Sequence, residues 1–181
     1  MVHAVRFFSQ RAPNHLHRGF GCGVAALMML LRHHQVPVPV PSYRQLCVCL
    51  WLTVPPSIKG WPQGSGMAAY STDVERALYG LQSPTGKKIK FAAITDEEPE
   101  VALQSIRKAL KVGPVMTGMW GRGFGGDFGH WIVVIGYQNG ELLYLDPWCL
   151  RKQVRHLPAQ DFPQHWASYA LYFRHPCNCA Q

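Results

Sequence analysis

The chain has 181 residues, a length that fits one compact domain spanning 1–181. Its 48% hydrophobic and 15% charged residues exclude a disordered protein. The formal net charge of +8 favours an anionic polymer or surface as a possible partner, but no run of five or more basic residues and no zinc-finger spacing indicates a specific nucleic-acid site.

The first twenty residues are expected to be extended and then loop-like. A strand is predicted at Val5 to Phe8 and ends before Pro13-Asn14. Charges and histidines stand where a secretory signal would have an apolar core, and the apolar run 24–31 is too short to span a bilayer. We expect no membrane span, and a cytoplasmic protein or one secreted without a conventional signal peptide.

Helices are predicted in the first two thirds of the chain. The segment 21–34 is apolar nearly all round, which is typical of a buried central helix whose carboxyl end is complemented by His33 and His34. Capping-box spacings open three more helices, and 53–70 is predicted to be a long loop. The three further helices cover 42–52, 72–81 and 95–112.

The last third of the chain has the character of a sheet. Strands are predicted at 115–120, 130–137, 142–146 and 167–173, and 121–129 is a loop with five glycines. Asn139-Gly140 is a type I′ hairpin signal that joins the second and third strands. The order favours an α+β fold, in which N-terminal helices pack on a C-terminal antiparallel β-sheet.

Cys22 stands at the start of the apolar helix, between Gly21 and Gly23. The amino end of a helix carries a partial positive charge that stabilises a thiolate, and the two glycines let a substrate backbone approach closely. Taken alone, a cysteine here indicates only a small residue that packs at a helix start. A catalytic assignment therefore depends on a partner elsewhere in the chain.

His130 opens an apolar strand directly after the glycine-rich loop, where its imidazole could serve as the base for Cys22. Asp146 follows 16 residues later, across the predicted hairpin, and could orient the imidazole. The two side chains meet at one end of this hairpin if the strand pairing contains a bulge or an offset. Alone, they fit a hydrogen-bonded core histidine and a turn residue before Pro147.

Three segments together resemble the papain-like peptidases that trim double-glycine leader peptides from bacteriocins. They are 21–31 (GCGVAALMMLL), 129–137 (GHWIVVIGY) and 144–148 (YLDPW), and 113–115 (GPV) resembles the strand before the histidine. The resemblance implies a papain-like fold and a bacterial thiol protease that needs no metal or organic cofactor. It also implies a catalytic triad of Cys22, His130 and Asp146 that works through an acyl-enzyme.

In this family a glutamine upstream of the cysteine helps to form the oxyanion hole, so Gln10 is the candidate, with the backbone N–H of Cys22 as the second donor. Gln10 lies farther from Cys22 than in the compact leader peptidases, and Asn14 and His17 are substitutes. The loop 55–70 is expected to line the substrate cleft, although an ordinary surface loop fits equally well. The predicted substrate contacts are Gly21, Gly23, Trp61, Tyr70, Gly129 and Trp131.

Several functions are compatible with these segments. The substrate could be a leader peptide, or a host protein if the chain is a secreted bacterial effector. A peptidoglycan amidase or endopeptidase would suit the basic charge, but 146–148 (DPW) fits the peptidase pattern better. An acyltransferase on the same scaffold and a non-catalytic binding domain also remain open. The presence of Cys22, His130 and Asp146 argues against a non-catalytic binding domain.

The other five cysteines suggest no disulfide framework. Cys47 and Cys49 fit packing thiols. Cys177 and Cys179, with His175 nearby, form a weak metal pattern that lacks a fourth ligand. We therefore predict no metal site.

Overall fold

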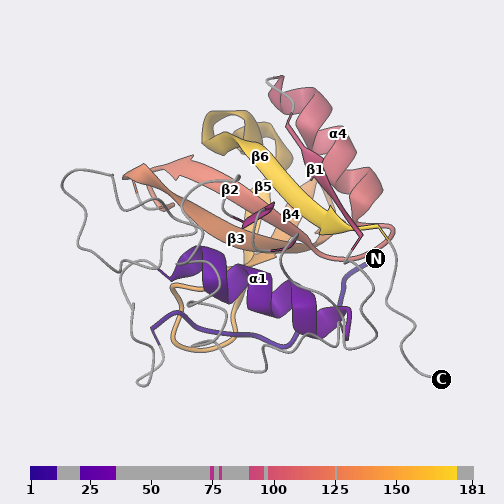
Figure 1. Ribbon diagram of the computed structural model, residues 1–181. Coiled ribbons are helices and arrows are strands. Elements are labelled where there is room, and N and C mark those ends of the chain that lie inside the picture. The colour runs from indigo at the N-terminus through magenta and orange to yellow at the C-terminus, as the bar shows by residue number, and fades with distance from the viewer. Residues whose placement is uncertain are drawn as a thin grey trace.

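The computed structural model describes residues 1–11, 21–35, 74, 75, 78, 90–95, 98–124 and 126–174, without the side chains of 126–128. Within this part of the chain, a six-stranded antiparallel sheet has the order β1-β6-β2-β3-β4-β5. Helix α1 lies against one face, and α4 lies on the other side (Figure 1). The predicted α+β fold is confirmed. The elements are α1 (Cys22–His33), β1 (Phe91–Ile94), α4 (Pro99–Ala109), β2 (Val115–Gly121), β3 (Gly126–Gln138), β4 (Glu141–Leu145), β5 (Val154–Pro158), the 3-10 helix η1 (Ala159–His165) and β6 (Trp166–Phe173).

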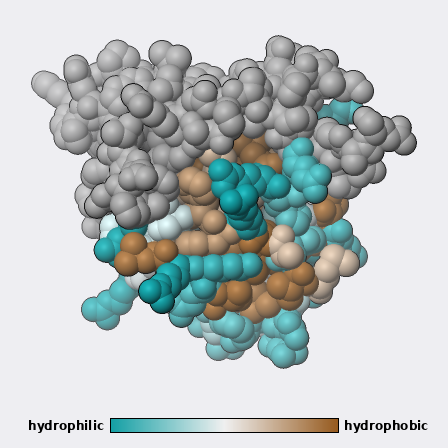
Figure 2. All heavy atoms as spheres, turned by 90° about the horizontal axis from the view of Figure 1, so that it is seen from below, coloured by the Kyte–Doolittle hydropathy of each residue, from teal (hydrophilic) through white to brown (hydrophobic). Residues whose placement is uncertain are grey.

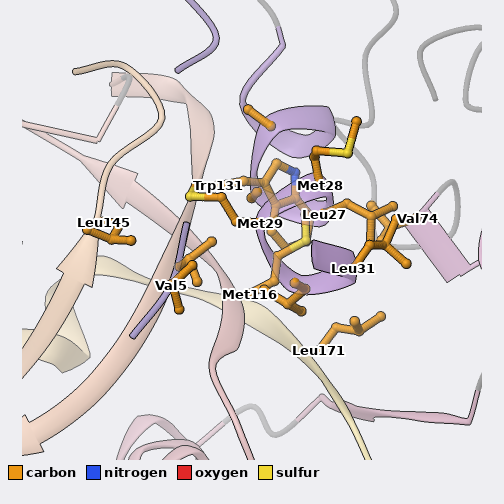
Figure 3. Close-up of a cluster of buried hydrophobic side chains, with 14 of the residues drawn as sticks. Val5, Leu27, Met28, Met29, Leu31, Val74, Met116, Trp131, Leu145 and Leu171 are labelled. Carbon is orange, nitrogen blue, oxygen red and sulfur yellow. The ribbon is translucent and has the colours of Figure 1, made fainter. Parts of the chain in front are cut away.

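Helix α1 is the buried central helix that the sequence predicts. Every residue from Gly23 to Leu31 is buried, and the helix packs on β3 and β2. Figure 3 shows Leu27 and Met29 within a cluster that also receives Met116 from β2 and Trp131 from β3. This packing fixes the position of the first residue of the helix, Cys22, relative to the sheet.

The second core lies on the opposite face of the sheet. Helix α4 buries Ala102, Ile106 and Ala109, which recur at helical spacing and face β6 and η1. The helix is shorter than predicted, because Pro99 occupies its first turn with Glu98 as the N-cap. Capping by Thr95 is therefore wrong.

The β3–β4 hairpin carries a bulge that decides which face its residues occupy. Asn139 and Gly140 have φ of 51° and 80°, as a type I′ turn requires. Gly136 pairs with Leu143, but Val134 pairs with Tyr144, so Ile135 is an extra residue in β3. Continued past the bulge, the register would put Asp146 opposite Ile132, whose side chain is on the same face of β3 as that of His130. Without the extra residue in β3, Asp146 would be on the opposite face.

The N-terminal segment 1–11 runs beside this hairpin without forming the predicted strand at Val5 to Phe8. Its isolated bridge joins Val2 to Gly136, and the His3 N–H donates to the Ile135 carbonyl at 2.7 Å. Val5 is instead buried against α1 and the sheet. A bulge leaves its extra residue outside the ladder, and here the N-terminal segment supplies the missing backbone partner.

The remaining sequence predictions have mixed outcomes. The strands at 115–120, 130–137, 142–146 and 167–173 are confirmed within one or two residues, except that β3 already begins at Gly126, so the 121–129 loop is partly wrong. Strands β1 and β5 were not predicted. The predicted segments 42–52 and 53–70 lie outside the described residues. Of the predicted helix 72–81, the described residues 74, 75 and 78 are helical.

Candidate active site

Three side chains from distant parts of the chain meet where α1 begins and β4 ends. His130 Nε2 lies 2.6 Å from Asp146 Oδ1, and the side chain of His130 is also hydrogen-bonded to that of Cys22. Because Nε2 faces the carboxylate, Nδ1 is the nitrogen that remains for the sulfur. The imidazole therefore stands between a thiol and a carboxylate, which is the arrangement that nucleophilic catalysis by cysteine needs.

The imidazole of His130 is held in its charged form although it is only 9% exposed. Burial by itself lowers the pKa of this group, but the hydrogen bonds to Asp146 and Cys22 and their negative charges outweigh it and raise the pKa to about 9. At neutral pH a histidine with this pKa is protonated. An imidazolium is the partner that stabilises a neighbouring thiolate.

Both oxygens of Asp146 are occupied. Oδ1 accepts from His130 and from the Trp148 backbone N–H at 2.8 Å, and Oδ2 accepts from Arg155 Nη1 at 2.7 Å. Burial raises the pKa of this carboxyl, but the bonds and charges of His130, the Trp148 amide and Arg155 lower it below its ordinary value. Asp146 is thus an ionised and rigidly oriented acceptor for His130.

The segment before α1 contacts the same region. The Gln10 N–H donates to the Pro147 carbonyl at 2.9 Å, and the Ser9 hydroxyl reaches the same oxygen at 3.4 Å. Gln10 is buried, next to the turn that carries Asp146. Cys22 is the first residue of α1, so its N–H has no acceptor within the helix. Asn14 and His17 lie outside the described residues.

The comparisons with known proteins identify the family of the chain. The model of the Peptidase_C39 like family matches residues 2–172, nearly the whole chain. The chain belongs to this family. It is a papain-like cysteine protease, as the resemblance of its three segments implied. Among curated proteins, none matches the chain.

Solved structures of C39 peptidases share the fold. A C39-like peptidase from Bacillus anthracis has a TM-score of 0.61 at 18% identity, over 95% of this chain and 96% of that one. A double glycine motif protease from an AMS/PCAT transporter, in complex with the leader peptide, has 0.56 at 20% identity, over 95% and 92%. The peptidase domain of Streptococcus ComA, a bifunctional ABC transporter of a quorum-sensing pathway, has 0.54 at 18% identity, over 83% and 88%.

The predicted substrate contacts of this C39-like chain fall into three groups. Gly21 and Gly23 flank Cys22 at the start of α1 and are buried. Gly129 has φ of 68°, which favours glycine, and the Trp120 ring lies 3.5 Å from where its Cβ would stand. Trp131 is only 5% exposed and packs edge-to-face on Tyr169 in the core, which opposes the predicted substrate contact. Trp61 and Tyr70 lie outside the described residues.

Four side chains near the candidate triad were given no role by the sequence predictions. Arg155 binds Asp146, and Arg11 lies over the exposed Trp148 ring at 5.1 Å. Trp120 covers Gly129, the neighbour of His130. Trp148 stands inside the aspartate motif 144–148, and this position was the available signal for it. For Arg155 there was none, because β5 itself was not predicted.

Several large apolar side chains are exposed among the described residues, and they include Trp120, Trp148 and Leu150. On the face that Figure 2 shows, hydrophobic and hydrophilic side chains of the described residues alternate at the surface. Apolar atoms normally make up much of a protein surface. Exposure alone therefore assigns no role to these residues.

The described residues show no group of three or more His, Cys, Asp or Glu side chains placed to hold a metal ion. Cys22 and Cys149 are free thiols, and the other four cysteines lie outside this part of the chain, as does His175. No helix in the described ranges has the length and apolarity to cross a membrane.

Proposed function

We propose that this cysteine protease cleaves peptide bonds with Cys22 as nucleophile, His130 as acid and base, and Asp146 as the residue that orients His130. The observation that carries the proposal is the double engagement of the His130 side chain, with Asp146 and with Cys22. The same hydrogen bonds raise the pKa of His130 to about 9 against the effect of burial. A core histidine without function has no need of two such partners.

In the acylation step, the Cys22 thiolate attacks the carbonyl carbon of the scissile bond and forms a C–S bond. The carbonyl π electrons move to oxygen, where the Cys22 N–H and the Gln10 side chain would donate hydrogen bonds. When the tetrahedral intermediate collapses, the C–N bond breaks and the His130 imidazolium gives its proton to the leaving amine. The products are a free amine and a thioester on Cys22.

In deacylation, water takes the place of the leaving amine, and His130 acts as a base instead of an acid. Neutral His130 takes a proton from water as the oxygen attacks the thioester carbon. The C–S bond then breaks, and the carboxylic acid leaves. Cys22 is released as a thiolate beside the imidazolium, so one cycle consumes one water and one peptide bond.

The substrate we propose is an extended peptide or protein segment, with bacterial leader peptides as the first class to test. The related double glycine motif protease is in complex with the leader peptide, and its fold matches over 95% of this chain. A role as a secreted effector that cleaves host proteins uses the same chemistry.

The nucleophile is tested by alkylation with iodoacetamide at pH 7, followed by mass spectrometry of each cysteine. Cys22 should react far faster than Cys149 and the remaining four cysteines, and His130→Ala should remove this advantage. Cys149→Ala is the matched control and should leave Cys22 labelling unchanged. Equal labelling of all six thiols would contradict the proposal.

The substrate class is tested with a peptide library, leader peptides that end in a double glycine and purified peptidoglycan, each with and without an added amine acceptor. Peptide cleavage that Cys22→Ala abolishes supports a peptidase. Release of peptidoglycan fragments instead would indicate an amidase or endopeptidase of the cell wall. Transfer to the amine in preference to water would indicate an acyltransferase.

A further inference from the structure

Arg155 reaches the candidate triad from β5, at the edge of the sheet. Its Nη1 lies 2.7 Å from Asp146 Oδ2, the oxygen that His130 does not use. The side chain of Asp146 is 3% exposed and that of Arg155 is 40% exposed. An ion pair between two exposed groups contributes little, but here one partner is a buried carboxylate, which costs much more to leave unpaired.

The strand register fixes Arg155 in this position. Tyr144 pairs directly with Arg155 across β4 and β5, and the guanidinium carbon lies 5.6 Å from the centre of the Tyr144 ring. A guanidinium that contacts an aromatic ring and donates to a carboxylate loses much of its rotamer freedom. The contact with Asp146 is therefore a product of the fold and not of a freely moving surface side chain.

The carboxylate needs two separate restraints to point at His130. The Trp148 N–H and the His130 ring both bind Oδ1, so neither of these two bonds holds Oδ2. The bond from Arg155 holds Oδ2 and so further restricts rotation of the carboxylate about Cβ–Cγ. It also places a positive charge beside Asp146, which favours the ionised form.

We propose that Arg155 is a positioning residue for catalysis, which acts through Asp146 by fixing the direction and the ionisation of its carboxylate. This inference rests on the proposed function of Cys22, His130 and Asp146. Among the described residues, Arg155 makes no hydrogen bond or ion pair with Cys22 or His130. It extends the hydrogen-bonded chain to four side chains, from β5 to α1.

Other charged or titratable groups also face this carboxylate. His130 faces it from β3, Tyr144 comes from β4, and the Cys149 thiol lies in the following turn. The charge of Arg11, in the N-terminal segment, interacts with the Cys149 thiol. Cys22 of α1 is linked to Asp146 through the side chain of His130. Of these, only His130 and Arg155 donate side-chain hydrogen bonds to Asp146 among the described residues.

The test compares Arg155→Met, Arg155→Lys and the control Arg151→Met, which removes an exposed charge four residues earlier. For Arg155→Met we expect kcat/KM for peptide cleavage to fall by about 10- to 100-fold, as for other side chains that orient a catalytic group. The acidic limb of the profile of kcat/KM against pH should move to higher pH in this variant, because Asp146 then protonates more readily. Arg155→Lys should recover part of both effects, since it restores the charge without the fixed geometry.

A second measurement does not depend on turnover. NMR titration of the Asp146 carboxyl carbon should show protonation at higher pH in Arg155→Met than in wild type or Arg151→Met. Arg155→Met with wild-type kcat/KM and an unmoved Asp146 titration would overturn the inference, as would equal losses in Arg155→Lys and Arg155→Met without a pH shift. If the wild type fails to cleave peptides while the Asp146 titration still responds to Arg155, the proposed function fails and the electrostatic contact stands.

Discussion

His130 and His34 are both buried, and they are held in opposite charge states. His130 is 9% exposed and has a pKa of about 9, whereas His34 is 4% exposed and has a pKa of about 4. Burial lowers the pKa of both rings. His130 has a carboxylate and a thiol as partners, while His34 has the neighbouring histidines His33 and His3, whose charges lower its pKa further.

The partners of a buried histidine therefore decide its charge. Within the described residues, His34 Nε2 has no hydrogen-bond partner, and its ring packs on Phe173 at 5.0 Å and on Gly113. The sequence suggested that His33 and His34 complement the carboxyl end of α1. For His34 this is wrong at neutral pH, because a ring with a pKa of about 4 carries no charge there.

The largest effect is expected when the anion beside His130 is removed. Asp146→Asn keeps the size of the side chain but loses the charge, so kcat/KM should fall by about 10²- to 10⁴-fold. The pKa of His130 should also fall, because one of the groups that raise it is gone. A kcat/KM profile against pH would show both effects. Glu141→Gln, at the opposite end of β4, is the control and should change neither.

Acid should lower the unfolding free energy because the buried His34 ring is held neutral in the fold. The pKa of His34 is lowered in the fold from 6.5 to about 4, so it contributes stability above pH 6.5 that is lost as the pH falls towards 4. His34→Leu cannot take up this proton. Urea unfolding at pH 7.5 and 4.5 should show a decrease in unfolding free energy that is smaller in the variant by about 2–3 kcal/mol. Equal decreases would show that His34 titrates normally.

A smaller effect is expected where the His34 ring meets the backbone. A Cβ on Gly113 would lie 2.6 Å from His34 Cε1 and 2.7 Å from Nε2, too close for either group to remain in place. Gly113→Ala should therefore lower the unfolding free energy by about 1–3 kcal/mol without changing kcat. In the double variant with His34→Ala, most of this loss should disappear, because the clashing ring is absent. Additive losses would contradict the contact.

The smallest effect should come from a histidine that has a carboxylate partner but is exposed. His156 Nδ1 lies 2.8 Å from Glu141 Oε2, and its side chain is 56% exposed. Because solvent screens such a pair, His156→Gln should change the unfolding free energy by about 0.5 kcal/mol or less. Thermal unfolding at pH 6 measures it. A loss well above about 1 kcal/mol would show that solvent does not screen this pair.

The sequence predicted the parts of the fold that depend on local patterns. The apolar run of α1 and the Asn139-Gly140 turn have strong local signals, and both are confirmed. The bulge at Ile135 has no such signal, because it depends on a backbone partner more than 130 residues away in His3. Yet this bulge sets Asp146 on the same face of the hairpin as His130. The sequence could name the residues of the candidate triad but not the register that unites them.

Arg155 was hidden for a related reason. Its strand, 154–158 (VRHLP), is short, mixed in polarity and ends in proline, so it resembles a loop until β4 offers an edge to pair with. Trp131 shows the opposite error. Its place beside His130 suggested a substrate contact, but alternation along β3 turns its ring into the core. Side-chain direction in a strand follows from the register, which the tertiary fold decides.

Residues 1–11 support the part of the hairpin that carries Asp146, so changes in this segment should affect catalysis. His3 supports the bulge, and the Gln10 amide supports the carbonyl that follows Asp146. A ligand that displaced this segment from the hairpin would disturb the support of Asp146 and so slow turnover. Such a ligand would be recognisable by a lower kcat together with faster amide exchange at His3.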